Sequence, residues 1–239
     1  MITLLVSPEA FDQERIEVEG DDYRHLFRAR RVAVGERLRA VDGQGRARWA
    51  EIDQIDRRRA SLMLGPTAPA NEPAYALHLL VAALRSERAS WLVEKATELG
   101  VYSIHFIATE RTPRKYAPAS LERLQRVAAA ALQQCHRSRL PDITGVEPRD
   151  TWIARLQDTA RTDRYVLRPE AESPASQTTE RTAGLVLVGP EGGWSATETN
   201  ELEALGCRGL SLGDRILRIE TAAIAVAARL IPLGSPMLD

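Results

Sequence analysis

The arrangement of apolar and polar positions changes close to residue 70. Before this point, short apolar segments alternate with turn residues, and strands are predicted at 48–53 and 60–64. The stretch Asp42-Gly43-Gln44-Gly45 ahead of them is typical of a hairpin turn, because glycine adopts the positive φ values that tight turns require. The first part of the chain is therefore predicted to consist of short strands joined by turns.

A linker is predicted between this part and the rest of the chain. Residues 65–73 contain three prolines, and proline interrupts both helices and central strands. After the linker, strands alternate with helical patterns. We therefore expect two domains, a small one at 1–70 and a larger one at 74–239.

The elements of the larger part follow from periodicity and capping residues. The helical pattern that contains Trp91 and Leu99 is predicted to end at Gly100, and Ser195-Ala196-Thr197-Glu198 is predicted to begin a helix with a capping box. Strands are predicted at 77–84, 104–108, 165–167, 185–188 and 210–212, and further helices at 121–134, 152–156 and 219–230. Strands that alternate with helices favour an α/β fold with a mainly parallel sheet.

Composition excludes several classes of protein. The chain has 239 residues, of which 44% are hydrophobic, so it can bury a sizeable core. No apolar run approaches the roughly 18–20 residues of a membrane span, and the N-terminal residues lack the pattern of a signal peptide. A cytoplasmic location without membrane contact is expected. Cys135 and Cys207 have no metal-ligand spacing, and no zinc-binding histidine motif occurs, so no metal is expected.

Positive charge is concentrated in two blocks, although the net charge of the chain is −1. Residues 24–48 contain eight arginines against two carboxylates, and residues 111–139 contain six arginines and one lysine against one carboxylate. Such blocks on a nearly neutral protein are typical of a localised phosphate-binding face. The alternative is that they are solvated surface arginines without a partner.

Two segments with glycine-containing turns, 188–194 and 211–222, lie at or directly after the ends of predicted buried strands. Ligands of open α/β sheets bind at such positions, because backbone donors and acceptors converge beyond the strand ends. Neither segment has the G-x-G-x-x-G fingerprint of NAD enzymes or the G-x-x-x-x-G-K-[ST] loop of NTPases, which disfavours both classes. On physical grounds alone, both could be tight strand-to-helix turns, with Glu191 as a carboxylate at a helix start.

Several motifs together point to one family. They are Gly189-Pro190-Glu191-Gly192-Gly193, Leu212-Gly213-x-Arg215-Ile216-Leu217-Arg218-x-Glu220-Thr221-Ala222, Glu94-Lys95-Ala96-Thr97-Glu98-Leu99-Gly100-Val101, Glu110-Arg111, Gln134-Cys135-His136-Arg137, and His25-Leu26 with Arg30. Through them, nearly the whole chain resembles the RNA small-subunit methyltransferase E family of the knotted SPOUT superfamily. Two positions depart from the family's usual pattern: Ser86-Glu87 replaces a lysine-rich turn, and Ile219 stands where threonine is usual.

The resemblance implies a small PUA-like β-barrel followed by a trefoil-knotted α/β methyltransferase domain, with an active site beside a homodimer interface. It implies S-adenosylmethionine as the methyl donor and N3 of a uridine in 16S ribosomal RNA of the small subunit, uridine 1498, as the target. A glycine-rich wall suits the donor, because missing side chains let backbone groups approach it closely. The residues implied to bind the donor are Leu167, Pro169, Gly189, Pro190, Glu191, Gly192, Gly193, Ser211, Leu212, Gly213, Ile216 and Leu217.

Methylation at N3 requires that the proton of this weakly acidic nitrogen be removed, or that the developing anion be stabilised. Arg218 is expected to polarise the uracil oxygens or favour the anion, and Glu191 to take a proton or orient the group that does. The alternative for both is a paired arginine and glutamate that holds the loops. The residues expected to contact RNA are Arg24, His25, Arg28, Arg30, Arg31, Arg111, Arg114 and Arg137.

Further expectations concern assembly, histidines and function class. The small residues at 222–228 of the last predicted helix favour close packing in a homodimer, with burial inside one subunit as the alternative. His78 and His105 are expected to be hydrogen-bonded core residues, and His136 is a candidate RNA contact. Two other functions stay open: a SPOUT-type methyltransferase acting on another RNA, such as transfer RNA, and a non-catalytic RNA-binding protein, against which the intact glycines argue.

Overall fold

The computed structural model describes residues 1–24, 26, 32–112, 120–158, 163–171 and 182–232. The chain divides into two compact units. The first comprises Met1–Glu72 and Ala129–Leu140, and the second comprises Pro73–Ala128 and Pro141–Asp239. The sequence predicts one domain boundary, between residues 70 and 74. It does not predict that residues 129–140 belong to the first unit.

The first unit is built on a five-stranded sheet in the order β1-β3-β4-β5-β2. β1 is parallel to β3, and the other neighbouring pairs are antiparallel. The predicted hairpin turn at 42–45 is confirmed, since it joins β3 to β4. The elements are β1 (Thr3–Leu5), α1 (Pro8–Phe11), β2 (Arg15–Glu19), α2 (Gly20–Tyr23), β3 (Arg37–Val41), β4 (Ala47–Ile55) and β5 (Arg59–Thr67).

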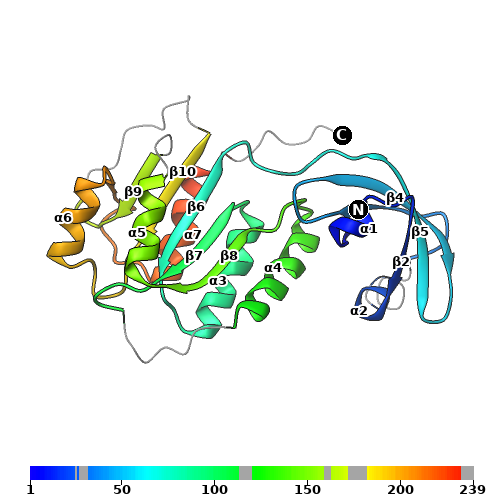
Figure 1. The fold of residues 1–239 in the computed structure, drawn as a ribbon, viewed down its shortest axis with the longest axis horizontal. Helices are drawn as coiled ribbons and strands as arrows, with labels where there is room; N and C mark the ends of the chain where they lie inside the picture. Colours follow the sequence, from blue (N-terminus) through cyan, green and yellow to red (C-terminus); the bar gives the residue numbers. More distant parts are fainter. Residues whose placement is uncertain (25, 27–31, 113–119, 159–162, 172–181, 233–239) are drawn as a thin grey trace. The chain divides into compact units, whose positions relative to one another are not determined.

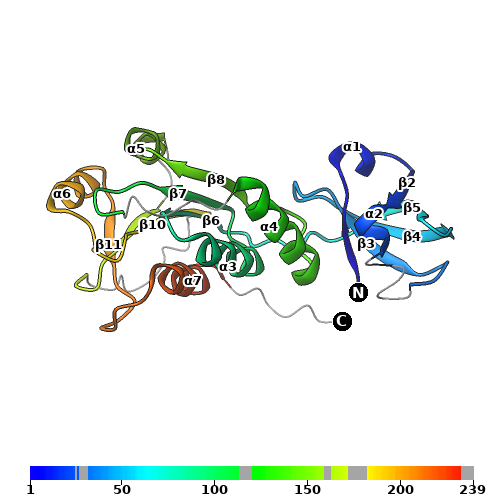
Figure 2. The same ribbon diagram turned by 90° about the horizontal axis from the view of Figure 1, so that it is seen from below.

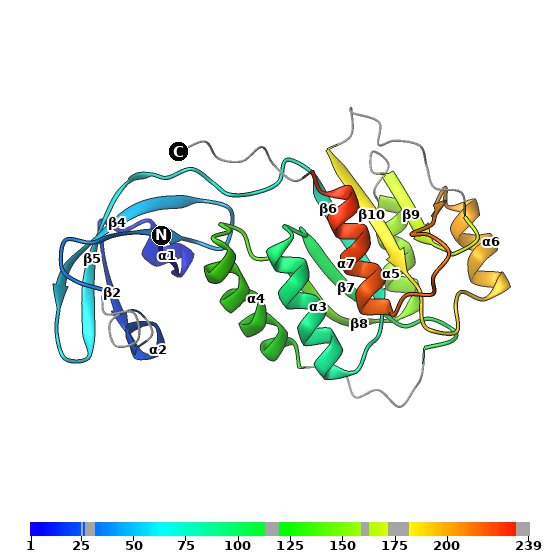
Figure 3. The same cartoon turned by 180° about the vertical axis from the view of Figure 1, so that it is seen from behind.

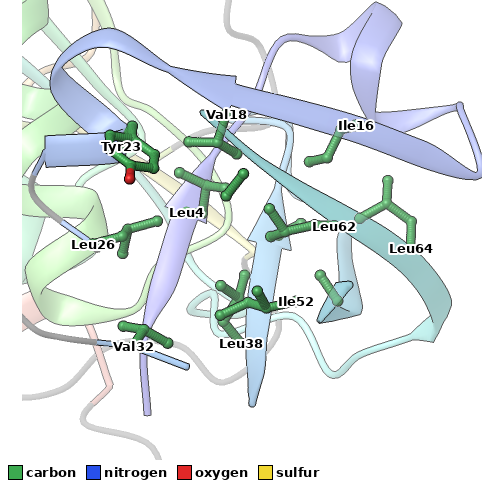
Figure 4. Close-up of a cluster of buried hydrophobic side chains, with 13 residues drawn as sticks. Leu4, Ile16, Val18, Tyr23, Leu26, Val32, Leu38, Ile52, Leu62 and Leu64 are labelled. Atoms are coloured by element: carbon green, nitrogen blue, oxygen red, sulfur yellow. The ribbon is translucent and has the colours of Figure 1, made fainter. Parts of the chain in front are cut away.

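Alternation along these strands places every second side chain in one core. In β2, Ile16 and Val18 are buried while their neighbours are exposed, and they pack with apolar side chains from the other four strands (Figure 4). β5 is longer than predicted and continues to Thr67, through the first residues of the predicted linker. Among the described residues β1 and β2 are not paired with each other, so the sheet of this PUA-like unit forms a half-barrel.

Buried polar contacts hold the segment 129–140 in the first unit. Arg39 is only 3% exposed. It donates from Nη1 to the carbonyl oxygen of His136 at 2.7 Å and from Nη2 to Oγ of Ser138 at 2.8 Å. Oε1 of Glu72 accepts from the backbone N–H of Ser138 at 2.7 Å. Because a buried charged group without partners is costly, these bonds tie the segment to the sheet.

The second unit contains a six-stranded, fully parallel sheet in the order β11-β9-β10-β6-β7-β8, as the predicted α/β fold requires. Its strands are β6 (Ala76–Ala82), β7 (Ser103–Ile107), β8 (Asp142–Glu147), β9 (Asp163–Leu167), β10 (Ala183–Val188) and β11 (Arg208–Leu210). Its helices are α3 (Ser86–Glu98), α4 (Leu121–Cys135, whose last turns belong to the first unit), α5 (Arg149–Asp158), α6 (Ala196–Ala204) and α7 (Ile219–Leu230). β8 is not predicted, because this edge strand carries no apolar run and buries only its last residue, Glu147. β11 ends two residues earlier than the predicted strand at 210–212.

Helices cover both faces of this sheet. α3 and α7 pack against each other on one face, and α5 lies on the other (Figures 1 and 2). α3 and α7 stand in front of the sheet in the view from behind (Figure 3). The core on the α5 side includes Trp152 of α5 and Leu202 of α6, and Nε1 of Trp152 donates to the carbonyl oxygen of Ala108 at 2.9 Å.

Two predicted helix boundaries are confirmed. α3 is followed by Gly100 with φ of +89°, where a Cβ atom would also lie 2.4 Å from Pro73. α6 begins with the capping box: Oγ of Ser195 accepts from the N–H of Glu198 at 3.0 Å, and Oε2 of Glu198 accepts from the N–H of Ser195 at 2.9 Å. In the part of the chain that the structure describes, no helix is long and apolar enough to cross a membrane. The trefoil knot stays a prediction.

Candidate functional site

Three loops meet at the carboxyl ends of β11, β9 and β10. These strands are parallel and adjacent, so their carboxyl ends share one edge of the sheet. The loops surround a pocket of about 420 Å³, a volume typical of a small-molecule site. The pocket is lined by 167–169 at the end of β9 and after it, by 188–194 at the end of β10 and after it, and by 210, 212, 213, 215–219 and 222, from the end of β11 into α7.

Eleven of the twelve residues implied to bind the donor line this pocket. The exception, Ser211, is buried behind it. Oγ of Ser211 donates to the carbonyl oxygen of Pro169 at 3.0 Å and accepts from the N–H of Gly213 at 3.2 Å. Ser211 therefore joins the loop after β9 to the loop after β11 rather than facing the pocket.

The wall formed after β10 depends on the missing side chain of Gly189. A Cβ atom there would lie 2.8 Å from Nε1 of Trp194, so even alanine would force the indole to move. Trp194 also lines the pocket, and its buried Nε1 has no hydrogen-bond partner among the described residues. Since a buried N–H without an acceptor is costly, this donor is suited to bind an acceptor on a ligand.

Arg168 is a polar residue of the pocket that is not one of the twelve, although the resemblance implies the loop Leu167-Arg168-Pro169 as a donor loop. Its side chain is 14% exposed, and Nη1 donates to Oε1 of Glu203 at 2.8 Å. Its Nε and Nη2 atoms are buried and have no partner within the described part of the chain. Its position between two predicted residues, Leu167 and Pro169, is the only signal that the sequence offers for it.

The two predicted catalytic residues lie on different loops and are not paired with each other. Arg218 is the exposed N-cap residue of α7, and its side chain forms no ion pair with any described residue. Glu191 is also exposed, and its Oε1 lies 3.6 Å from Nη1 of Arg88 on α3. The arginine–glutamate pair that the sequence offers as an alternative therefore exists, but its arginine is Arg88.

The residues present fit the methyl donor that the resemblance implies. S-adenosylmethionine offers an adenine ring, hydroxyls and a carboxylate. The pocket offers apolar side chains, glycine backbone, and the buried N–H groups of Trp194 and Arg168 without partners. One apolar side chain at the pocket, Ile216, is 91% exposed and can pack against a bound molecule.

The first predicted RNA-binding block is only partly described by the structure. Arg24 is exposed and forms an ion pair with Asp21, which neutralises part of its charge. The other members of this block, together with one of the second block, lie outside the described residues and stay predictions: His25, Arg28, Arg30, Arg31 and Arg114.

The two described arginines of the second block make contacts that the sequence does not predict. Nη1 of Arg111 donates to the carbonyl oxygen of Gly192 at 2.6 Å, so this side chain reaches the glycine-rich wall of the pocket. The side chain of Arg137 is 4% exposed, and its Nη2 donates to Oε2 of Glu72 at 2.8 Å. The expectation that Arg137 belongs to an exposed RNA face is corrected, because its guanidinium is buried against a carboxylate.

The first unit also has a basic turn that is not among the RNA-binding residues expected from the sequence. Arg57 and Arg58 are exposed on the turn between β4 and β5, and neither forms an ion pair with a described residue. With Tyr23, Arg24 and Arg59 they line a second pocket of about 710 Å³. The run of three arginines between two predicted strands was the available signal.

The histidines predicted for the core are hydrogen-bonded, as expected. Nδ1 of His78 lies 2.8 Å from Oγ of Ser103, and Nδ1 of His105 lies 3.1 Å from Oγ1 of Thr144. Burial lowers the pKa of His105 to about 4, and the positive charge of Arg155 adds to the effect. Among the described residues, no group of three or more His, Cys, Asp or Glu side chains could hold a metal ion.

The chain is similar to known RNA methyltransferases in sequence and in structure. A family profile described as RNA methyltransferase domain matches residues 71–231, and one described as RNA methyltransferase PUA domain matches residues 18–62. The ribosomal RNA small subunit methyltransferase E of Mycobacterium bovis is 30% identical over 217 residues, which cover 86% of this chain and 82% of the relative. The protein of the same name from Synechocystis is 27% identical over 232 residues, or 95% of this chain and 76% of that relative.

A solved structure extends the similarity to the fold of both units. The crystal structure of a ribosomal RNA small subunit methyltransferase E from Neisseria gonorrhoeae, bound to S-adenosyl methionine, aligns with a TM-score of 0.83 and 25% identity over 96% of each chain. The methyltransferase profile spans all three loops around the pocket. The chain therefore belongs to the ribosomal RNA small subunit methyltransferase E family of RNA methyltransferases.

Proposed function

We propose that this protein transfers the methyl group of S-adenosylmethionine to N3 of a uridine in 16S ribosomal RNA of the small subunit, by family resemblance uridine 1498. The observation that carries the proposal is the pocket at the carboxyl ends of β9, β10 and β11, which gathers eleven of the twelve residues implied to bind the donor. The Neisseria relative, whose structure contains S-adenosyl methionine, supports the choice of donor.

The donor supplies an electrophilic methyl group on a sulfonium sulfur. In this proposal the loops after β9, β10 and β11 hold it by backbone contacts and apolar packing, and the indole N–H of Trp194 binds one of its acceptor atoms. Holding the methyl group in line with N3 of the target base provides a large part of the rate acceleration, because alignment replaces a bimolecular encounter.

The reaction forms a bond between N3 and the methyl carbon as the carbon–sulfur bond breaks, and the N3 proton must pass to an acceptor. Arg218 is exposed at the pocket and has no ion-pair partner among the described residues, so its guanidinium is free to bind O2 or O4 of uracil and stabilise the anion. Glu191 lies on the neighbouring loop as a candidate acceptor for the proton or as a group that orients it.

Binding of ribosomal RNA requires phosphate contacts outside the pocket, and the target base must leave its stack to reach the donor. Arg24, Arg57 and Arg58 offer exposed guanidinium groups on the first unit for this purpose. The free-energy cost of unstacking and unpairing the target base is offset by the contacts to the phosphates and to the pocket.

The deciding experiment compares nucleosides of 16S ribosomal RNA from cells with and without this gene by mass spectrometry. N3-methyluridine should be absent in the deletion strain and return when the gene is restored. Loss of the modified nucleoside from transfer RNA alone would mean that another RNA is the substrate. Failure of the purified protein to bind S-adenosylmethionine in calorimetry would favour a non-catalytic RNA-binding protein.

A further inference from the structure

Arg88 on α3 lies between the carboxylate of Glu191, which lines the pocket, and that of Glu220, which lies in α7 next to pocket-lining Ile219. Its Nη1 is 3.6 Å from Oε1 of Glu191, and its Nε is 3.6 Å from Oε1 of Glu220. Glu191 belongs to the glycine-rich loop after β10, and Glu220 belongs to the first turn of α7, two residues after Arg218. One guanidinium therefore bridges two loops that are far apart in the sequence.

The mostly buried carboxylate of Glu220 relies on this bridge for a partner of opposite charge. Its side chain is 10% exposed, and its Oε2 is buried without a hydrogen-bond partner in the described part of the chain. Arg88 provides its one ion pair among the described residues, and the N-terminal end of α7 adds a weaker favourable field. Without the cation, Glu220 would be a buried carboxylate with no partner, close to a second carboxylate of like charge.

We propose that Arg88 is a positioning residue of the methyl-donor pocket. By binding Glu191 and Glu220 together, it fixes the spacing between the loop after β10 and the first turn of α7, and with it the position of Arg218. Arg88 is not among the residues that line the pocket, so it acts through the two carboxylates. This inference rests on the proposed function, because it assumes that S-adenosylmethionine occupies the pocket.

The test is the dissociation constant for S-adenosylmethionine, measured by calorimetry on the full chain. Arg88→Gln keeps part of the aliphatic stem but removes the charge, and it should weaken donor affinity about tenfold. Arg88→Lys should recover part of the loss, because a point charge can hold one carboxylate but cannot bridge two. The matched control is Arg149→Ala, which breaks an exposed ion pair with Glu201 between α5 and α6 and should leave donor affinity unchanged.

The mechanism of action is tested in a second background, Glu191→Gln with Glu220→Gln. In that protein, adding Arg88→Gln should change donor affinity less than about threefold, because no carboxylate charge is left to hold. The same double background keeps the test valid if Arg88→Gln alone does not fold, since it removes the buried charge that would cause unfolding. The melting temperature of each variant without donor reports folding separately.

The rival role for Arg88 is a contact to an RNA phosphate. In that case Arg88→Gln would leave donor affinity unchanged and would weaken RNA binding equally in both backgrounds, with a salt slope lower by about one unit. If the wild type binds the donor and Arg88→Gln binds it with the same affinity, this inference is overturned and the proposed function is left intact. Absence of donor binding by the wild type would overturn both.

Discussion

The guanidinium of Arg111 donates a hydrogen bond of 2.6 Å to the carbonyl oxygen of Gly192, in the wall of the pocket. The residue before it is tied to the same region, because the backbone N–H of Glu110 donates to Oε1 of Glu198 at 3.0 Å. The loop after β7 is therefore fixed at two points, to the loop after β10 and to the first turn of α6. A basic side chain that the sequence assigns to RNA binding thus also supports the glycine-rich loop.

Arg111→Ala should weaken donor binding as well as RNA binding. Losing one charge-assisted hydrogen bond at a partly exposed site costs about 0.5–1.5 kcal/mol, which corresponds to roughly a two- to tenfold weaker donor affinity. Calorimetry with S-adenosylmethionine measures the effect. Arg126→Ala is the control, because Arg126 is exposed and, among the described residues, its side chain bonds only to the carbonyl oxygen of Glu122 in its own helix. A donor affinity of Arg111→Ala equal to that of the wild type would show that the contact is not needed.

Substitutions of two glycines in the same loop should differ in their effects. Gly192→Val should abolish donor binding while the protein stays folded, because a Cβ there would meet its nearest neighbour, the Arg111 side chain, at an ordinary distance of 3.4 Å. Gly189→Ala should lower the free energy of unfolding by about 1–3 kcal/mol, because its Cβ would overlap Trp194. Urea denaturation and calorimetry separate the two effects. Gly145→Ala, whose Cβ would have no atom of a described residue within 4 Å, should change neither.

Arg218→Ala and Arg58→Ala should have opposite effects. Arg218→Ala should keep RNA affinity and lower kcat by about 100-fold or more, because it removes a group that stabilises the developing charge. Arg58→Ala should keep donor affinity and weaken RNA binding, with the slope of log affinity against log salt reduced by about one unit. The measurements are RNA affinity at several salt concentrations and single-turnover methylation. An unchanged salt slope for Arg58→Ala would mean that this turn is solvated surface.

The protein should be a homodimer built from its second unit. Ala223 and Ala227 of α7 are fully buried within the chain, so part of the small-residue pattern serves internal packing, the alternative left open by the sequence. Ala222, Ile224 and Ala225 are only partly buried and can pack against a second copy. Light scattering at micromolar concentration should give twice the chain mass of 26.5 kDa. A monomer under these conditions would contradict the prediction, and Ile224→Glu should shift the dimer toward monomer.

Stability should fall as the pH drops from about 6.5 toward 4. His105 has a pKa lowered to about 4 in the folded protein, against about 6.5 when unfolded, so in this window the unfolded chain binds more protons. The free energy of unfolding therefore decreases as pH falls through it. Urea denaturation at pH 7 and pH 5 measures the difference, which His105→Gln should reduce. An equal pH dependence in wild type and His105→Gln would show that other groups are responsible.

Most of the pocket could be predicted because its chemistry is local in sequence. Gly189 and Gly213 follow apolar strands, and in a parallel sheet the ends of neighbouring strands lie together whatever their separation along the chain. The capping box at Ser195 is likewise contained within four residues. Local patterns of this kind predict both the conformation of a loop and its position at the edge of the sheet.

Contacts between distant segments could not be predicted. Arg88 meets Glu191 and Glu220 only because α3 packs against α7, and no motif at residue 88 reveals this. Arg137 has the same composition signal as an exposed RNA contact, but its partner Glu72 lies 65 residues earlier. The sequence shows how many arginines a block contains, but it does not show which of them are exposed. Only an exposed arginine can reach a phosphate.

The return of Ala129–Leu140 to the first unit has a consequence for biosynthesis. A nascent chain that ends before residue 136 lacks two of the acceptors for the Arg39 guanidinium, on His136 and Ser138, and the backbone donors of Ser138 and Arg139 for the Glu72 carboxylate. The N-terminal unit, although translated first, cannot complete its hydrogen bonding until well over half of the protein has left the ribosome. A gene fragment that stops at the linker therefore encodes only part of the first unit, because it lacks residues 129–140.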